Sequence, residues 1–174
     1  MRDLPEDSKL LDVVGVRVEM PSSQPIVLLK ESEGKRYLPI WVGAVEATAI
    51  AFAQQGVAPP RPLTHDLLKD VITATGNTIS KINLSSIKDG VFYAELIFSN
   101  GVEVSARPSD AIALALRAGA PIFGSNALLD EVGIEINEGE IGVGHEGPSQ
   151  EGAEGELERF REFLDQIDPE DFAN

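Results

Sequence analysis

The amino-acid sequence predicts a mixed α/β (α+β) domain in which helices pack on a largely antiparallel mixed sheet. First, short runs of β-branched and alternating apolar residues follow one another near the N-terminus, separated by brief polar turns. Second, Asn100-Gly101 is a strong hairpin signal between two further strand-like runs. Third, residues 110–118 form a helix pattern with apolar residues nearly all round, which is typical of a helix buried on several sides.

The first part of the chain predicts an antiparallel meander of three strands. Leu11–Met20 alternates in the manner of a strand, and Pro25–Lys30 and Tyr37–Val42 follow after short turns. Pro39 lies inside the third run and indicates an edge strand or a bulge, because proline cannot donate to a ladder.

Two helices are expected next, over Gly43–Gln55 and from Thr64, as N-cap, to about Thr75. Apolar residues at spacings of three and four predict the buried face of each helix. These are Val45, Ala49, Phe52 and Ala53 in the first helix, and Leu67, Leu68, Val71 and Ile72 in the second.

The strand pair 78–87 and 92–99 turns at Lys88-Asp89-Gly90, and a third strand over 102–106 leads into the central helix. Ser109 is the expected N-cap of that helix and Gly119 its end. The segments expected beyond it are a short strand at 122–123, a brief helix 126–131 capped by Ser125, and a last strand at 134–136.

Composition divides the chain into a polar leader (1–10), the main domain (11–136), a glycine-rich acidic linker (137–155) and an acidic amphipathic helix (156–174). The net charge is −15, and residues 131–174, with fourteen acidic and two basic residues, contribute −12 of it. Residues 1–130 have a net charge of −3 and lack the excess of basic residues expected of a nucleic-acid-binding protein.

The chain has no cysteine, which excludes disulfides, thiol nucleophiles and thiolate metal sites. Its start lacks the pattern of a secretory signal, and no apolar run reaches the ~18 residues of a membrane span. We therefore expect a cytoplasmic protein without a membrane partner.

The candidate functional residues lie in a sequence motif that occurs twice in similar form. Arg61-Pro62-Leu63-Thr64-His65-Asp66 and Arg107-Pro108-Ser109-Asp110 both place an arginine, a hydroxyl residue and an aspartate at the start of an apolar helix. The free amides at helix N-termini attract anions. If the two entrances converge, they form a polar pocket, with Glu46 in the first turn of the preceding helix a candidate neighbour.

Such a pocket suits phosphodiester chemistry, because carboxylates can hold a divalent metal, arginines can clamp phosphate oxygens and a histidine can move a proton. The alternative is structural: an aspartate in a first helical turn stabilises the helix, and arginine often pairs with it. Spacing alone leaves both interpretations open. His145 lies in the glycine-rich linker and receives no role.

Four blocks, LPIWVGAVEATAIA, RPLTHDLL, KDGVFYAEL and RPSDAIALALRAGAPIF, resemble the bifunctional nuclease domain family over about residues 11–136. The resemblance implies a mixed α/β fold and a homo-oligomer, most simply a dimer. Plant members of the family are described as cleaving both DNA and RNA. The family's polar signature falls on Glu46, Arg61, Thr64, His65, Asp66, Arg107, Ser109 and Asp110.

The leading hypothesis is therefore a nuclease, a hydrolase acting on phosphodiester bonds in DNA or RNA. His65, Asp66 and Asp110 are the expected catalytic residues, and Arg61 and Arg107 the phosphate-binding ones. Glu46, Thr64 and Ser109 would support them, and Glu46, Asp66 and Asp110 could bind Mg or Mn. The alternative is a non-catalytic oligomeric binding or regulatory protein in which the Arg-Asp motifs are structural.

Overall fold

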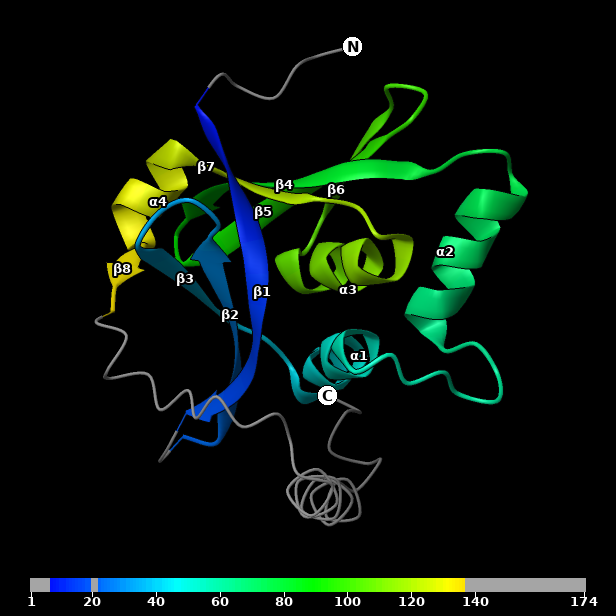
Figure 1. The fold of residues 1–174 in the computed structure, drawn as a ribbon, viewed down its shortest axis with the longest axis horizontal. Coiled ribbons are helices and arrows are strands. Elements are labelled where there is room, and N and C mark those ends of the chain that lie inside the picture. The colour runs from blue at the N-terminus through cyan, green and yellow to red at the C-terminus, as the bar shows by residue number, and fades with distance from the viewer. Residues whose placement is uncertain (1–6, 20–21, 137–174) are drawn as a thin grey trace. The chain divides into compact units, whose positions relative to one another are not determined.

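A computed structural model describes residues 7–19 and 22–136 of the chain. The predicted linker 137–155, the predicted helix 156–174 and residues 1–6 of the leader lie outside the described residues. The described part contains an eight-stranded sheet in the order β6-β5-β4-β7-β1-β2-β3-β8, with four helices (Figure 1). All neighbouring strands are antiparallel except β4 and β7, which confirms the predicted mixed, largely antiparallel fold.

The elements follow the predicted order along the chain. The strands are β1 (Ser8–Glu19), β2 (Gln24–Glu31), β3 (Arg36–Trp41), β4 (Ile79–Lys88), β5 (Val91–Phe98), β6 (Glu103–Ala106), β7 (Ile122–Ser125) and β8 (Ile134–Glu135). The helices are α1 (Ala44–Gln54), α2 (Thr64–Ala74), α3 (Pro108–Ala118) and α4 (Asn126–Val132).

Strands β1, β2 and β3 form the predicted antiparallel meander, although β1 begins three residues earlier than expected, at Ser8. The edge position expected for Pro39 has a direct structural explanation. Strand β8 pairs with Arg36 and Tyr37 of β3, and within residues 7–19 and 22–136 no strand pairs with Pro39 on that side.

Strand β7 joins the two antiparallel halves of the sheet. It pairs antiparallel with the start of β1 and parallel with Ile82–Leu84 of β4. A parallel pair needs a crossover, and here α3 lies between β6 and β7 along the chain. The sequence predicted a short strand here but not its parallel pairing, because the pairing depends on contacts between distant segments.

Helix α3 is the centre of the core, as its all-round apolar pattern predicts. Residues Ala111–Ala115 are buried, and the helix packs against β4, β5, α1 and α2. Its N-cap is Arg107 rather than the predicted Ser109, because Pro108 occupies the first helical position, where its fixed φ is favourable. Gly119 ends the helix in the left-handed conformation with φ 65°.

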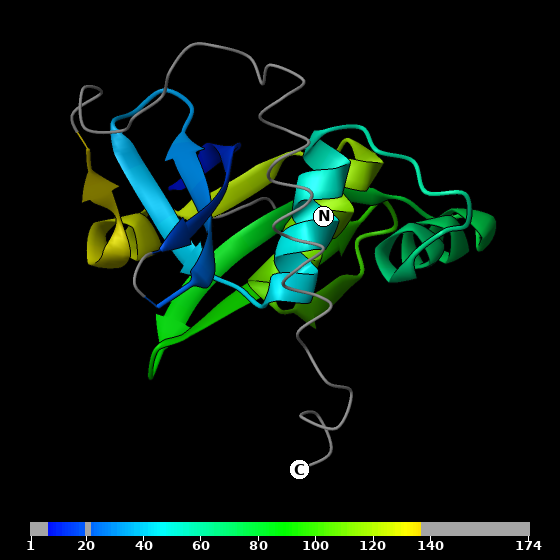
Figure 2. The ribbon, with the colours of Figure 1, turned by 90° about the horizontal axis from the view of Figure 1, so that it is seen from below.

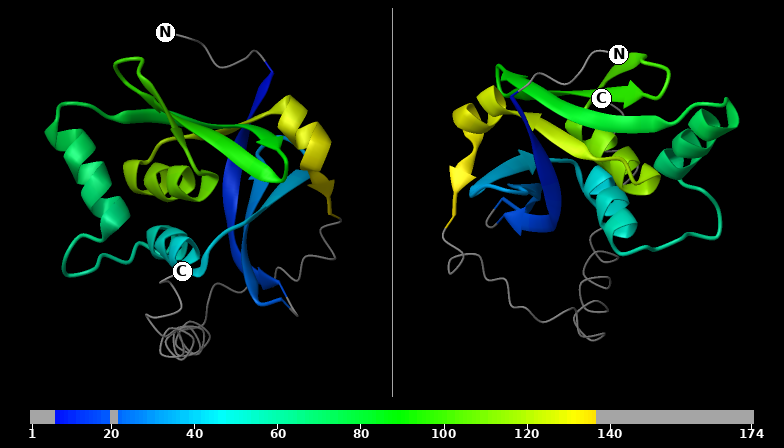
Figure 3. Two further views of the ribbon diagram at one scale, coloured as in Figure 1. Left: turned by 180° about the vertical axis from the view of Figure 1, so that it is seen from behind. Right: turned by 45° about the horizontal axis from the view of Figure 1, so that its top comes forward.

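The predicted buried faces of α1 and α2 are wrong in part. In α1 the buried residues are Ala47, Ala49 and Ile50, whereas Val45 is exposed. In α2 no residue is buried, and the N-cap is Leu63 rather than Thr64. Helix α2 lies on the outer side of α3, away from the β1–β3 half of the sheet (Figures 2 and 3).

Helix α4 closes the opposite end of the described part, against β3, β4 and β7. Ser125 is its N-cap as predicted, and its hydroxyl accepts a hydrogen bond from the Leu128 amide at 3.1 Å. Arg36 of β3 donates to both carboxylate oxygens of Glu31 and also reaches Asp130 of α4. None of the helices in the described ranges is long and apolar enough to cross a membrane.

Candidate active site

The two Arg-Pro helix entrances meet within one chain. His65, in the first turn of α2, lies with its Nε2 2.9 Å from Oδ1 of Asp110 in the first turn of α3. This contact fulfils the condition on which the predicted pocket depends.

Arg107 connects this pair to a third helix. Its Nε donates to Asp110 Oδ2 at 2.7 Å and its Nη2 to Asp110 Oδ1 at 3.1 Å, so the pairing is bidentate. The same Nη2 donates to Oε1 of Glu46, in the first turn of α1, at 3.0 Å. We call Glu46, His65, Arg107 and Asp110 the polar cluster.

The members of the polar cluster differ in their access to solvent. The side chain of Arg107 is 66% exposed, whereas that of His65 is 13% exposed. Nη1 of Arg107 and Nδ1 of His65 have no hydrogen-bond partner among the described residues. The cluster therefore presents an open guanidinium edge and an imidazole nitrogen to which no described residue is hydrogen-bonded.

The electrostatics of the cluster keep Asp110 ionised. Burial raises the pKa of the Asp110 carboxyl, but the hydrogen bonds from Arg107 and His65 and the positive charge of Arg107 together leave that pKa below its ordinary value. The hydrogen bond to Asp110 in turn raises the pKa of Arg107. An ionised Asp110 accepts the Nε2–H of His65, which leaves the Nδ1 lone pair as the one that can take a proton.

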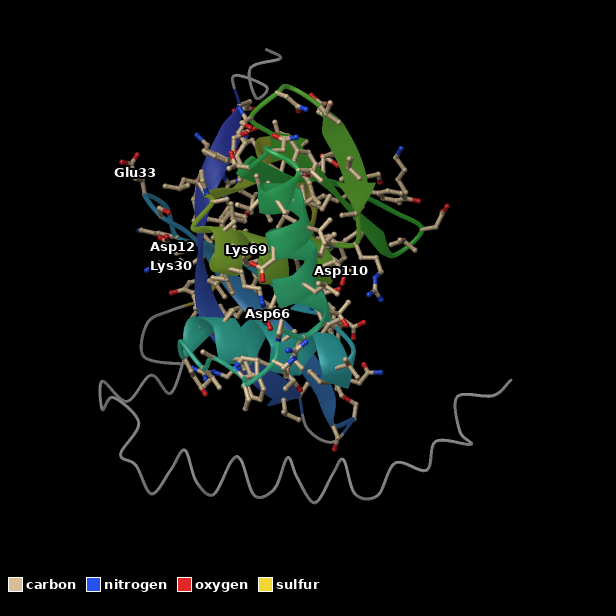
Figure 4. All side chains as sticks on the ribbon, turned by 90° about the vertical axis from the view of Figure 1, so that its right-hand side faces the viewer. Asp12, Lys30, Glu33, Asp66, Lys69 and Asp110 are labelled. Atoms are coloured by element: carbon tan, nitrogen blue, oxygen red, sulfur yellow. The ribbon has the colours of Figure 1, made fainter. Side chains whose placement is uncertain are left out.

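Asp66 makes its contacts outside the polar cluster. Its Oδ1 accepts from Nε of Arg117 at 2.6 Å, and its Oδ2 accepts from the backbone amide of Leu63 at 2.9 Å. Burial raises the pKa of Asp66, but these two hydrogen bonds and the nearby positive charge of Arg117 together leave that pKa below its ordinary value. Figure 4 shows Asp66 and Asp110 at separate positions beside α2. The expected catalytic role of Asp66 remains a prediction.

Arg117 is the residue that sequence reasoning missed. Its side chain is 9% exposed, and its Nη1 donates to the backbone carbonyls of Ala49 and Ala113 while Nε binds Asp66. It thereby fastens α2 to α3 and α1, and so positions His65. One signal could have found it, since it is the single charge after Asp110 in an otherwise apolar helix.

The other predicted site residues lie outside the polar cluster. Arg61 is exposed in the loop before α2, and it has no hydrogen bond or ion pair with another described residue. Thr64 is exposed at the start of α2, and Ser109 is buried at the start of α3. The phosphate-binding role of Arg61 and the supporting roles of Thr64 and Ser109 remain predictions.

The donors of the polar cluster do not fit a divalent-metal site as they stand. The guanidinium of Arg107 lies between the carboxylates of Glu46 and Asp110 and binds both. Within residues 7–19 and 22–136, no group of three or more histidine, cysteine, aspartate or glutamate side chains could hold a metal ion. Metal ligation by Glu46, Asp66 and Asp110 together therefore stays a prediction that this arrangement does not support.

A hollow of about 430 Å³ lies between the end of α1, the following loop and α2. Phe52, Val57 and Pro62 give it apolar walls, and Asp66 and Arg117 line it as well. The residues of the polar cluster do not line it. The contacts of a substrate with His65 and Arg107 would therefore lie outside this hollow.

Comparison with known proteins agrees with the resemblance of the four sequence blocks. A family model described as the bifunctional nuclease domain matches residues 27–137. Two curated relatives from Mycobacterium tuberculosis, "Uncharacterized protein MT1877" of strain CDC 1551 / Oshkosh and "Uncharacterized protein Rv1829" of strain H37Rv, are each 49% identical over 160 residues. Each alignment covers 92% of this chain and 95% of the relative. The chain belongs to the bifunctional nuclease domain family.

Proposed function

We propose that the protein is a nuclease that cleaves phosphodiester bonds at the polar cluster. The observation that carries the proposal is the contact of His65 with Asp110, at 2.9 Å, on the carboxylate that Arg107 binds bidentately. An oriented imidazole beside an exposed guanidinium combines a proton acceptor with a phosphate-binding group.

Each residue of the cluster has a role in this proposal. Arg107 binds a phosphate oxygen through its open edge and stabilises the negative charge that develops there during the reaction. His65 takes a proton from the attacking hydroxyl through Nδ1, and Asp110 holds the ring and stabilises the imidazolium that forms. Glu46 orients Arg107 from the other side. The new P–O bond forms as the old ester bond breaks, and the imidazolium returns the proton to the leaving oxygen.

These groups suit RNA better than DNA. The ribose 2′-hydroxyl is an internal nucleophile close to the phosphorus, so a base and a phosphate-binding cation are sufficient groups for its attack. DNA lacks this hydroxyl, and its cleavage would require a positioned water molecule. We therefore propose single-stranded RNA as the preferred substrate, since single strands leave the backbone accessible.

Cleavage of a labelled RNA oligonucleotide and of the matching DNA tests the proposal, with purified protein in EDTA and in Mg²⁺ or Mn²⁺. Asp110→Asn removes the charge that stabilises the imidazolium, and we expect the rate to fall by about 10²–10⁴-fold, the usual contribution of acid–base catalysis. Asp89→Asn is the matched control, because Asp89 lies in the exposed β4–β5 turn with φ 51°, which asparagine tolerates. Equal cleavage by both variants would refute the assignment.

A second candidate is a non-catalytic binding or regulatory protein. One observation favours it: every carboxylate of the polar cluster is already bound by an arginine or a histidine, as expected of a structural ion-pair network. In that case the wild-type protein cleaves neither oligonucleotide under any metal condition. Asp110→Asn would then lower the midpoint of thermal unfolding without changing any activity.

A further inference from the structure

The hollow between α1 and α2 contains polar groups that the polar cluster does not use. Arg117 lines it with a side chain that is 9% exposed, and its Nη2 has no hydrogen-bond partner among residues 7–19 and 22–136. Asp70 also lines it, with Oδ1 bound by Lys69 and Oδ2 without a partner in the described part of the chain. A nearly buried donor that stays unsatisfied in a native structure requires an explanation, and a bound ligand supplies one.

The walls of the hollow are apolar and held in place. The ring of Phe52 comes from the last turn of α1, and the backbone carbonyl of this residue accepts a hydrogen bond from the Val57 amide at 2.9 Å. Pro59 and Pro62 line the loop side, where the proline rings fix φ and limit the movement of the backbone. The volume of about 430 Å³ lies within the range of small-molecule pockets, about 300–1,000 Å³. The hollow therefore offers space for a flat ring beside Phe52.

The charges in the hollow favour a neutral polar ligand. Asp66 and Asp70 are four residues apart on α2, so their carboxylates lie on one side of the helix. These two carboxylates would repel an anion, and a cation would meet the guanidinium of Arg117. A wholly apolar ligand would displace water from Arg117 Nη2 and Asp70 Oδ2 without replacing its hydrogen bonds. The ligand must instead accept a bond from Arg117 and donate bonds to the carboxylates.

We propose that the hollow binds a guanine base of the single-stranded RNA substrate, an inference that rests on the proposed nuclease function. The base stacks on Phe52, its O6 accepts a hydrogen bond from Arg117 Nη2, and its N1–H and N2 amino group donate to Asp70 and Asp66. Each oxygen of Asp66 already accepts one bond, and a carboxylate oxygen has two lone pairs.

Guanine matches these polar groups better than the other bases do. Its Watson–Crick edge carries the acceptor O6 next to two separate donor groups, N1–H and the N2 amino group. Adenine, cytosine and uracil each present a single donor group on this edge. One of the two carboxylates, Asp66 or Asp70, would therefore be left without a donor from the base, at a cost in affinity.

The hollow and the polar cluster lie close enough for one RNA strand to contact both. Asp66, which lines the hollow, directly follows His65 in the first turn of α2 (Figure 4). On α3, Asp110 and Arg117 are seven residues apart, a rise of about 10 Å. This distance is of the order of the length of one nucleotide. The exposed Arg61 belongs to the loop that forms one wall, where it can bind a phosphate at the rim.

Binding of nucleoside monophosphates tests the base site separately from cleavage, because these compounds contain no phosphodiester bond between nucleotides. In isothermal titration calorimetry, the full chain should bind GMP at least about fivefold more tightly than AMP, CMP or UMP. IMP, which lacks the 2-amino group of guanine, should also bind more weakly than GMP. Equal affinities for GMP and AMP, or no detectable binding of GMP, would overturn the proposal.

Two variants test the residues of the site. Asp70→Asn replaces a carboxylate whose side chain is 55% exposed, and it should reduce the affinity for GMP at least about fivefold while changing that for AMP little. Phe52→Leu keeps an apolar side chain but removes the stacking ring, and it should weaken GMP and AMP alike. Asp89→Asn, in the exposed β4–β5 turn, is the matched control and should bind GMP as the wild type does. Circular dichroism should show that all three are folded, and GMP affinities that are equal in Asp70→Asn and Asp89→Asn would contradict the assignment.

Cleavage of an RNA oligonucleotide with a single guanosine separates this proposal from the nuclease proposal. The wild type should cleave next to the guanosine, and Asp70→Asn should lose this preference and cleave at other positions as well. Cleavage by the wild type at positions unrelated to the guanosine would refute the substrate-base assignment and leave the nuclease proposal standing. Binding of GMP without cleavage of any RNA would refute the nuclease proposal and support a site for a free guanine nucleotide instead.

Discussion

Replacing Arg117 with methionine should loosen α2 from the rest of the domain. Methionine keeps an apolar stem of similar length but removes the charge-assisted hydrogen bond to Asp66 at 2.6 Å and the bond to the Ala49 carbonyl at 3.0 Å. A charge-assisted bond contributes about 2 kcal/mol and a neutral one about 1 kcal/mol. Only the bond to Asp66 joins α3 to α2, because Ala49 belongs to α1. The expected loss in the opening equilibrium of α2 is therefore about 2 kcal/mol, or roughly 30-fold.

This loss should be local, because no residue of α2 is fully buried, and its contacts with the rest of the domain include the two polar contacts and the packing of Ile72 against the core. Hydrogen exchange of the α2 amides measures it directly. Arg61→Met is the control, since Arg61 is exposed and should change stability by less than about 0.5 kcal/mol. Adding Asp66→Asn to Arg117→Met should recover part of the loss, because it removes the unpaired carboxylate. Exchange in Arg117→Met no faster than in Arg61→Met would refute this account of how α2 is held.

Three further changes test other parts of the structure. Ser125→Ala removes the N-cap of α4 and should lower the free energy of unfolding in urea by about 1 kcal/mol. An unchanged urea midpoint would contradict the capping role of Ser125. Gly124→Ala places a Cβ 2.8 Å from Cδ1 of the buried Leu11 and should lower the free energy of unfolding by about 1–3 kcal/mol. An unfolding temperature in calorimetry equal to that of the wild type would contradict this. Asp66 and Asp110 have folded pKa values below their unfolded values, so their stabilisation is complete above about pH 4 and is lost as the pH falls through the folded values. The free energy of unfolding of Asp110→Asn should therefore fall less steeply below about pH 4 than that of the wild type. An equally steep fall would count against the pairing of Asp110 with Arg107 and His65.

Local sequence signals predicted most of the elements, because turns and caps depend on a few neighbouring residues. The hairpins at Asp89-Gly90 and Asn100-Gly101 and the cap at Ser125 needed no distant contact to be recognised. The parallel pairing of β7 with β4 could not be predicted, since it depends on how α3 brings distant segments together.

Periodicity located α2 and correctly placed Ile72 against the core, but Leu67, Leu68 and Val71 are exposed rather than buried. A stripe such as Leu67, Leu68 and Val71 shows that something must cover it, but it does not show whether that is the same chain. In the candidate site, the repeated Arg-Pro motif left open whether the two helix entrances meet, and the structure brings His65 and Asp110 together. It could not separate Asp66 from them, because the partner of Asp66, Arg117, lies two helical turns beyond Asp110 on α3.

Chemical rescue tests the central claim, that His65 in the polar cluster moves the proton during phosphodiester cleavage. Cleavage of single-stranded RNA by His65→Ala should fall by at least about 10²-fold and should be partly restored by added imidazole. His145→Ala, which replaces the other histidine of the chain, should cleave as the wild type does with and without imidazole. Undiminished cleavage by His65→Ala, or the same imidazole response in both variants, would contradict the account.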